Sequence, residues 1–141
     1  MTAINSGRIW LGTVVGGVVW TAWTMLVNIV FQRANYEAGQ EAGILLAESR
    51  YAYFLPVWIL TLFALTWLGS WTYARVRSSA GPGPATALKV GAVLGFAAGF
   101  PMNFSLASWL ALSRVTMVWW MLDLWIGAIL AVLVAGWFYK E

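Results

Sequence analysis

TMVWWMLDLWIGAILAVLVAGWFY, residues 116–139, is a long apolar stretch that contains a single charged residue, Asp123. A helix needs about 20 residues to cross a hydrocarbon core of about 30 Å. Three further apolar stretches, at residues 9–31, 51–73 and 88–112, are also long enough. The four stretches predict an all-α polytopic membrane protein, in which four transmembrane helices form an antiparallel bundle.

The composition supports this class. The chain has 141 residues, of which 62% are hydrophobic and 9% are charged. The links between the apolar stretches are short and leave no room for a separate soluble domain. We therefore expect residues 1–141 to form one four-helix transmembrane domain.

Two residue types are missing, and their absence removes several kinds of chemistry. The chain contains no cysteine and no histidine. Thiol exchange and thiolate zinc sites require cysteine, whereas imidazole ligation of haem and most catalytic dyads require histidine. We expect no enzyme activity, no catalytic residues, no cofactor and no metal site. The net charge is +3, and the 8 lysine and arginine residues are scattered along the chain without a cluster. This charge pattern does not predict nucleic-acid binding.

The basic residues predict the orientation in the membrane, because cytoplasmic loops carry more lysine and arginine than outer loops. The side with both termini and the 2–3 link carries Arg8, Arg75, Arg77, Lys89 and Lys140. The other side carries Arg33, Arg50 and Arg114. The bias predicts cytoplasmic N- and C-termini.

Small residues recur at a four-residue spacing in three of the apolar stretches. Membrane helices approach one another through such residues, because lipid provides no hydrophobic drive for helix association. The run GAVLGFAAG at residues 91–99 is a double GxxxG motif. The candidate helix-packing positions are Gly12, Gly16, Gly91, Gly95, Gly99 and Gly127.

Each stripe of small residues also includes a polar residue near its outer end: Asn28, Asn103 and Asp123, respectively. At a rise of 1.5 Å per residue, the three lie roughly 5–13 Å below the outer interface. If the stripes face one another, these side chains share one region of the interior. We therefore predict an intramembrane polar cluster of Asp123, Asn103 and Asn28.

A carboxylate within a membrane span is costly and requires an explanation. In the structural interpretation, Asp123 holds helices together through hydrogen bonds or is paired with an arginine reaching inward; the candidate ion-pair partners are Arg114, Arg33 and Arg50. In the functional interpretation, Asp123 binds a proton or a cation. An aromatic-lined cavity for an organic cation, with Asp123 as its counter-ion, is a third option.

The loop GPGPATAL, residues 81–88, and the final stretch WWMLDLWIGAILAVLVAGWFYK, residues 119–140, resemble those of uncharacterised small four-helix membrane proteins of bacteria. The resemblance implies a multi-pass protein of the bacterial inner membrane and carries no assigned activity. Because a bundle of this size has little interior, we expect its partners to be the lipid bilayer and other membrane subunits or a second copy of the chain.

Two function classes follow from the sequence. The glycine stripes and the small size favour a structural or accessory subunit, or a homo-oligomeric packing protein. The alternative is a small proton- or cation-coupled transporter or channel that uses Asp123.

Overall fold

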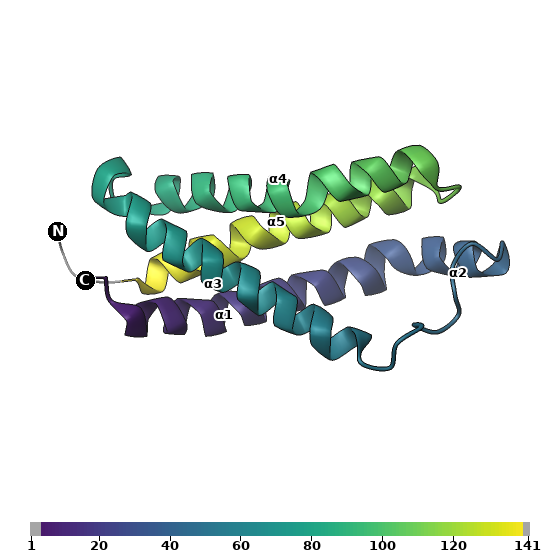
Figure 1. The fold of residues 1–141 in the computed structure, drawn as a ribbon, viewed down its shortest axis with the longest axis horizontal. Coiled ribbons are helices and arrows are strands. Elements are labelled where there is room, and N and C mark those ends of the chain that lie inside the picture. The colour runs from purple at the N-terminus through teal and green to yellow at the C-terminus, as the bar shows by residue number, and fades with distance from the viewer. Residues whose placement is uncertain (1–3, 140–141) are drawn as a thin grey trace.

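The computed structural model describes residues 4–139, and within them it is all-helical, with no β-strand (Figure 1). The elements are α1 (Ser6–Leu26), the π-helix η1 (Val27–Gln32), α2 (Arg33–Glu41), α3 (Phe54–Ala80), α4 (Pro84–Trp109) and α5 (Arg114–Phe138). Four helices are long and apolar enough to cross a membrane: Ser6–Glu41, Phe54–Ala80, Pro84–Trp109 and Arg114–Phe138. The prediction of an all-α chain with four such helices is confirmed.

The first helix is longer than the sequence pattern suggests, because α1, η1 and α2 run on without a break from Ser6 to Glu41. At 1.5 Å per residue this helix is about 54 Å long, which exceeds a hydrocarbon core of about 30 Å. No proline interrupts residues 32–41, and the helix ends where Gly43 adopts a positive φ of 70°. Residues 42–53 then return as an irregular segment to the start of α3.

Local sequence determines where the other helices begin. Before α4, Gly81 and Gly83 adopt φ values of 88° and 126°, which favour glycine, and Pro84 follows at the first helical turn. The Ser113 side chain caps α5 by accepting a hydrogen bond from the Val115 amide at 3.3 Å. The predicted span 88–112 is therefore shifted toward the N-terminus in the structure, since Leu110 is already extended.

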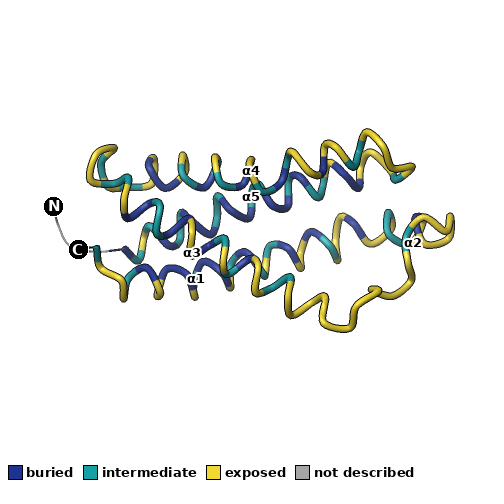
Figure 2. The backbone as a smooth tube through the Cα atoms, in the orientation of Figure 1, coloured by how far each residue is buried: buried dark blue, intermediate teal, exposed yellow. Residues whose placement is uncertain are grey.

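Helix α5 forms the centre of the fold. It packs against α1, α3 and α4, whereas α1 and α4 lie on either side of it (Figure 1). Its buried residues include Met117, Leu124, Ala128 and Val132. Figure 2 shows buried residues recurring along the helices of the bundle, whereas the segment 42–53 and the start of α3 are mainly exposed.

The described ends of the chain lie together at one end of the molecule (Figure 1). The Asn5 amide donates a hydrogen bond to the Tyr139 hydroxyl at 3.1 Å. The link between α3 and α4 lies at this same end, and α2 lies at the opposite end with the α4–α5 link (Figure 1).

The six candidate packing glycines are all buried, and all six lie where α5 packs closely against α1 or α4. An added Cβ at Gly95 would lie 2.7 Å from the Trp125 carbonyl oxygen, and one at Gly91 would lie 2.7 Å from the Ile129 Cα. An added Cβ at Gly16 would lie 2.6 Å from the Ala131 carbonyl oxygen. Since these neighbours are backbone atoms, the contacts leave no room for a side chain. The remaining close contacts join Gly12 to Ala135, Gly99 to Met121 and Gly127 to the Trp20 ring.

Candidate functional site

A pocket of about 720 Å³ lies in the half of the molecule away from the described termini. Its walls come from α1, η1, α2, the segment 42–53, the start of α3, and the outer parts of α4 and α5. All three residues of the predicted polar cluster, Asn28, Asn103 and Asp123, line this pocket. Its remaining lining is mainly apolar and aromatic.

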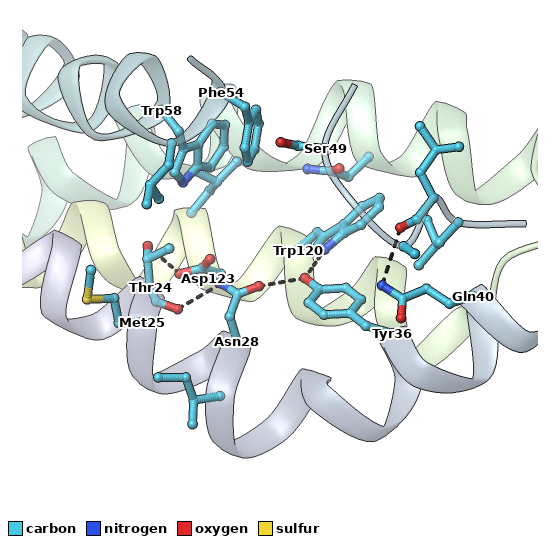
Figure 3. A pocket seen from close by; sticks show the side chains of 17 residues that line it. Thr24, Met25, Asn28, Tyr36, Gln40, Ser49, Phe54, Trp58, Trp120 and Asp123 are labelled. Atoms are coloured by element: carbon cyan, nitrogen blue, oxygen red, sulfur yellow. Dashed lines mark hydrogen bonds between the residues drawn. The ribbon is translucent and has the colours of Figure 1, made fainter. Parts of the chain in front are cut away.

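Asp123 joins α5 to α1 at the inner end of the pocket (Figure 3). Its side chain is 5% exposed, and its Oδ1 atom accepts a hydrogen bond from Thr24 Oγ1 at 2.9 Å. The indole of Trp23 donates to the Asp123 backbone carbonyl at 3.2 Å. Within residues 4–139 no donor is hydrogen-bonded to the second carboxylate oxygen, Oδ2. That oxygen is left for whatever occupies the pocket.

Hydrogen bonds extend from this point to the outer wall (Figure 3). Asn28 Nδ2 donates to the Thr24 carbonyl oxygen at 2.8 Å, and Asn28 Oδ1 accepts from the Tyr36 hydroxyl at 2.6 Å. The Tyr36 oxygen in turn accepts from Trp120 Nε1 at 2.7 Å. The chain of bonds fixes α1, α2 and α5 to one another around the pocket.

The π-helix η1 makes this arrangement feasible. In a pure α-helix, residues eight apart are rotated by about 80° relative to each other, after two full turns. The wider turns of a π-helix reduce the rotation per residue, so Tyr36 comes over Asn28. Gln32, which is fully buried, anchors the π-helix by donating from Nε2 to the Thr116 carbonyl oxygen at 3.0 Å. Such π segments are frequent at functional sites.

Asn103, a buried residue of α4, contributes a second acceptor to the pocket. Its side chain is 9% exposed, and its Nδ2 atom donates to the Gly99 carbonyl oxygen at 2.7 Å. This bond fixes the amide orientation, because a carbonyl oxygen accepts hydrogen bonds and cannot donate them. Among the described residues no donor is bonded to Asn103 Oδ1. Asn103 thus shares the pocket with Asp123 and Asn28 but is not hydrogen-bonded to either.

The arginines proposed as partners of Asp123 are placed elsewhere. Arg33 forms an ion pair with Glu37 at 3.0 Å on the exposed face of α2, which continues the helix outward. Arg50 and Arg114 are exposed. Across residues 4–139 no ion pair joins an arginine to Asp123. The structure therefore gives no support to an arginine counter-ion for this carboxylate.

The aromatic walls were not part of the predicted cluster. Phe54 and Trp58 stack with their ring centroids 6.1 Å apart, and they lie across the pocket from Asp123 (Figure 3). Tyr36 and Trp120 form the outer part of the pocket wall. The sequence contains a weak signal for Trp58 and Trp120, since both lie inside apolar stretches, but none for Tyr36.

The described residues contain no group of three or more histidine, cysteine, aspartate or glutamate side chains that could hold a metal ion. No lysine or arginine lines the pocket, and Asp123 is its one carboxylate among the described residues. The site therefore has the charge to bind a single positive group and lacks the charge to bind an anion.

A second pocket, of about 710 Å³, lies between α1 and α3. Trp10, Phe63 and Trp67 are among its lining residues. Thr13, the polar residue there, donates its hydroxyl to the Ile9 carbonyl oxygen at 2.8 Å. This groove offers apolar contact and no charged group.

Searches against protein-family models, curated proteins and solved structures found no match to this chain.

Proposed function

We propose that the protein is a multi-pass membrane protein with four antiparallel transmembrane helices, and that it binds a cation at Asp123 as a small transporter or channel. The membrane part rests on the four long apolar helices. It also rests on the apolar side chains that the bundle exposes, such as Leu60, Val93 and Phe104, each about two thirds exposed or more. A surface of this kind requires a lipid environment or a partner.

The proposed orientation places both termini in the cytoplasm, in a bacterial inner membrane. Arg8, Arg75, Arg77 and Lys89 support it, because they belong to the end of the bundle that contains both described termini. Lys140, which the sequence assigns to the same side, lies outside the described residues.

The cation-binding proposal rests on one observation: Asp123 is buried beside a large pocket, with one carboxylate oxygen unbonded and no arginine paired with it. Burying a carboxylate is costly unless it is neutralised by a proton or by a positive partner. A cation or a proton in the pocket would neutralise it. Release of that charge on the other side of the membrane would make the site a carrier.

The test is a flux measurement in proteoliposomes. Wild-type protein should carry a current of protons or monovalent cations, or exchange one for the other. Asp123→Asn should abolish this flux, whereas Glu37→Gln, which neutralises an exposed carboxylate, should leave it unchanged. An Asp123→Asn protein that folds and transports like wild type would refute the proposal.

A second candidate function is the structural or accessory role. The hydrogen bonds that join Thr24 and Trp23 to Asp123 hold α1 against α5, so Asp123 also serves packing. The apolar groove between α1 and α3 would accept a helix of another subunit or of a second copy. Purification in mild detergent at native expression level tests this role. A stoichiometric partner would support it, and a monomer would argue against it.

A further inference from the structure

We propose that the ligand of the Asp123 pocket is a lipophilic organic monocation, meaning an ammonium group on a hydrocarbon or aromatic body. This inference rests on the proposed cation binding and specifies its chemical class. It competes with two simpler ligands, a proton and an inorganic ion.

The size of the pocket favours an organic molecule. A proton needs no cavity, and a water molecule occupies about 30 Å³ of liquid volume. The pocket holds about 720 Å³, within the range of roughly 300–1,000 Å³ that is typical of sites for small organic ligands.

The buried acceptors are too few for an inorganic cation. Hard cations take about six or more oxygen ligands when they lose their water. Thr24 Oγ1 donates to Asp123 and can still accept, whereas Asn28 Oδ1 already accepts from Tyr36. On the buried residues of the lining, the acceptors that receive no hydrogen bond are Asp123 Oδ2, Asn103 Oδ1 and Thr24 Oγ1, which is fewer than six. An ammonium group needs only two or three acceptors.

The positions of Asp123 and Asn103 are compatible with one ligand whose ammonium group binds both. Gly99 packs against Met121 and Leu124 of α5, so Asn103, one turn further along α4, lies about a turn outward from Asp123. The ammonium group would bind Asp123 at the inner end. A second N–H of the same ammonium group would donate to Asn103 Oδ1.

The opposite wall provides contacts for the body of the ligand. The stacked rings of Phe54 and Trp58 lie across the pocket from Asp123 (Figure 3), and Leu55 and Leu124 also line the pocket. Aromatic faces attract a cation in addition to packing against apolar groups. One carboxylate and no basic side chain in the lining match a single positive charge.

The experiment uses calorimetric titration of the purified protein with a matched ligand pair. The pair is 1-naphthylmethylamine, which is positively charged at neutral pH, and 1-naphthylmethanol, which has the same body without the charge. The amine should bind wild-type protein about tenfold or more tightly than the alcohol, because a hydrogen bond to a charged group is the stronger kind. Sodium and potassium chloride should neither bind nor compete.

Variants locate the binding in this pocket. Asp123→Asn should weaken amine binding by about tenfold and leave alcohol binding nearly unchanged. Trp58→Leu should weaken binding of the amine by about threefold. Its matched control is Trp109→Leu, because Trp109 is 86% exposed and outside the pocket. Asn103→Ala keeps the test decisive if Asp123→Asn does not fold, since it removes the second acceptor and should also weaken amine binding.

Two results would overturn the inference, and they can be told apart. If Asp123-dependent flux of protons, sodium or potassium persists but the amine binds no more tightly than the alcohol, or neither binds, the organic ligand is wrong and the cation site stands. If neither ligand binds and Asp123→Asn changes no flux, the organic ligand and the proposed function are both wrong.

Discussion

Thr24 and Asp123 are 99 residues apart in the chain, and the Thr24 hydroxyl donates a hydrogen bond of 2.9 Å to the Asp123 carboxylate. The bond crosses from α1 to α5 and engages only one of the two carboxylate oxygens. Asp123 therefore has two roles in this account: it holds two helices together, and it presents its other oxygen to the pocket.

Loss of the Thr24 hydroxyl should destabilise the protein. Thr24→Val keeps the side-chain shape and removes the donor, so we expect a loss of about 1 kcal/mol in the free energy of unfolding, as is typical of polar contacts between membrane helices. Denaturant titration in detergent measures the change. Thr21→Val is the control, because the Thr21 hydroxyl bonds only the Gly17 carbonyl oxygen of its own helix. Equal effects of the two substitutions would contradict the role of Thr24.

The close contact of α4 with α5 predicts a strong effect at Gly95. Gly95→Ala places a Cβ 2.7 Å from the Trp125 carbonyl oxygen, so the helices must move apart, at a cost of about 1–3 kcal/mol. Gly7→Ala is the matched control: the new Cβ meets only Asn5 Oδ1 at 3.5 Å, and alanine favours the helix. Thermal unfolding should show a lower midpoint for Gly95→Ala alone. A Gly95→Ala protein as stable as wild type would show that this contact is looser than described.

The Tyr36 hydroxyl should matter for both stability and binding. Tyr36→Phe removes the donor to Asn28 and the acceptor for Trp120, and each lost bond costs about 1 kcal/mol. Since these bonds close the outer wall, the affinity for a pocket ligand should fall as well. Tyr51→Phe provides the control, because no hydrogen bond involves the Tyr51 hydroxyl in the described part of the chain. Calorimetry that finds identical ligand affinity in Tyr36→Phe and wild type would argue against a structured outer wall.

The orientation in the membrane can be tested with single cysteines, because the natural chain has none. A membrane-impermeant maleimide should label Glu48→Cys in intact cells, since the proposed orientation places the segment 42–53 outside. It should label Ser79→Cys, in the last turn of α3, only after the membrane is opened. The reverse pattern would place the termini outside.

Hydropathy was sufficient to predict the four helices, because a run of about 20 apolar residues has few other stable environments. The sequence also indicated the packing surface, since glycines four residues apart, such as Gly91 and Gly95, lie on one helix face. The exact helix limits depend on local details. The extension to Glu41 reflects the absence of a breaker before Gly43, which hydropathy does not measure.

The pocket was less accessible to prediction. Depth along the helices placed Asn28, Asn103 and Asp123 in one region, and they do line one cavity. The π-helix that brings Tyr36 to Asn28 has no clear sequence signature. The return of residues 42–53 against α2, with Leu45 and Leu46 in the pocket wall, depends on tertiary packing that periodicity does not reveal.

The most direct measurement of the central claim is protection of Asp123 from a carboxyl reagent. Dicyclohexylcarbodiimide is small enough to enter the pocket, and peptide mass spectrometry separates its adduct at Asp123 from adducts at Glu37, Glu41 and Glu48. If Asp123 binds a cation, a saturating concentration of that cation should reduce the Asp123 adduct and leave the glutamate adducts unchanged. An Asp123 adduct that persists undiminished in the presence of 1-naphthylmethylamine, sodium and potassium would contradict the account.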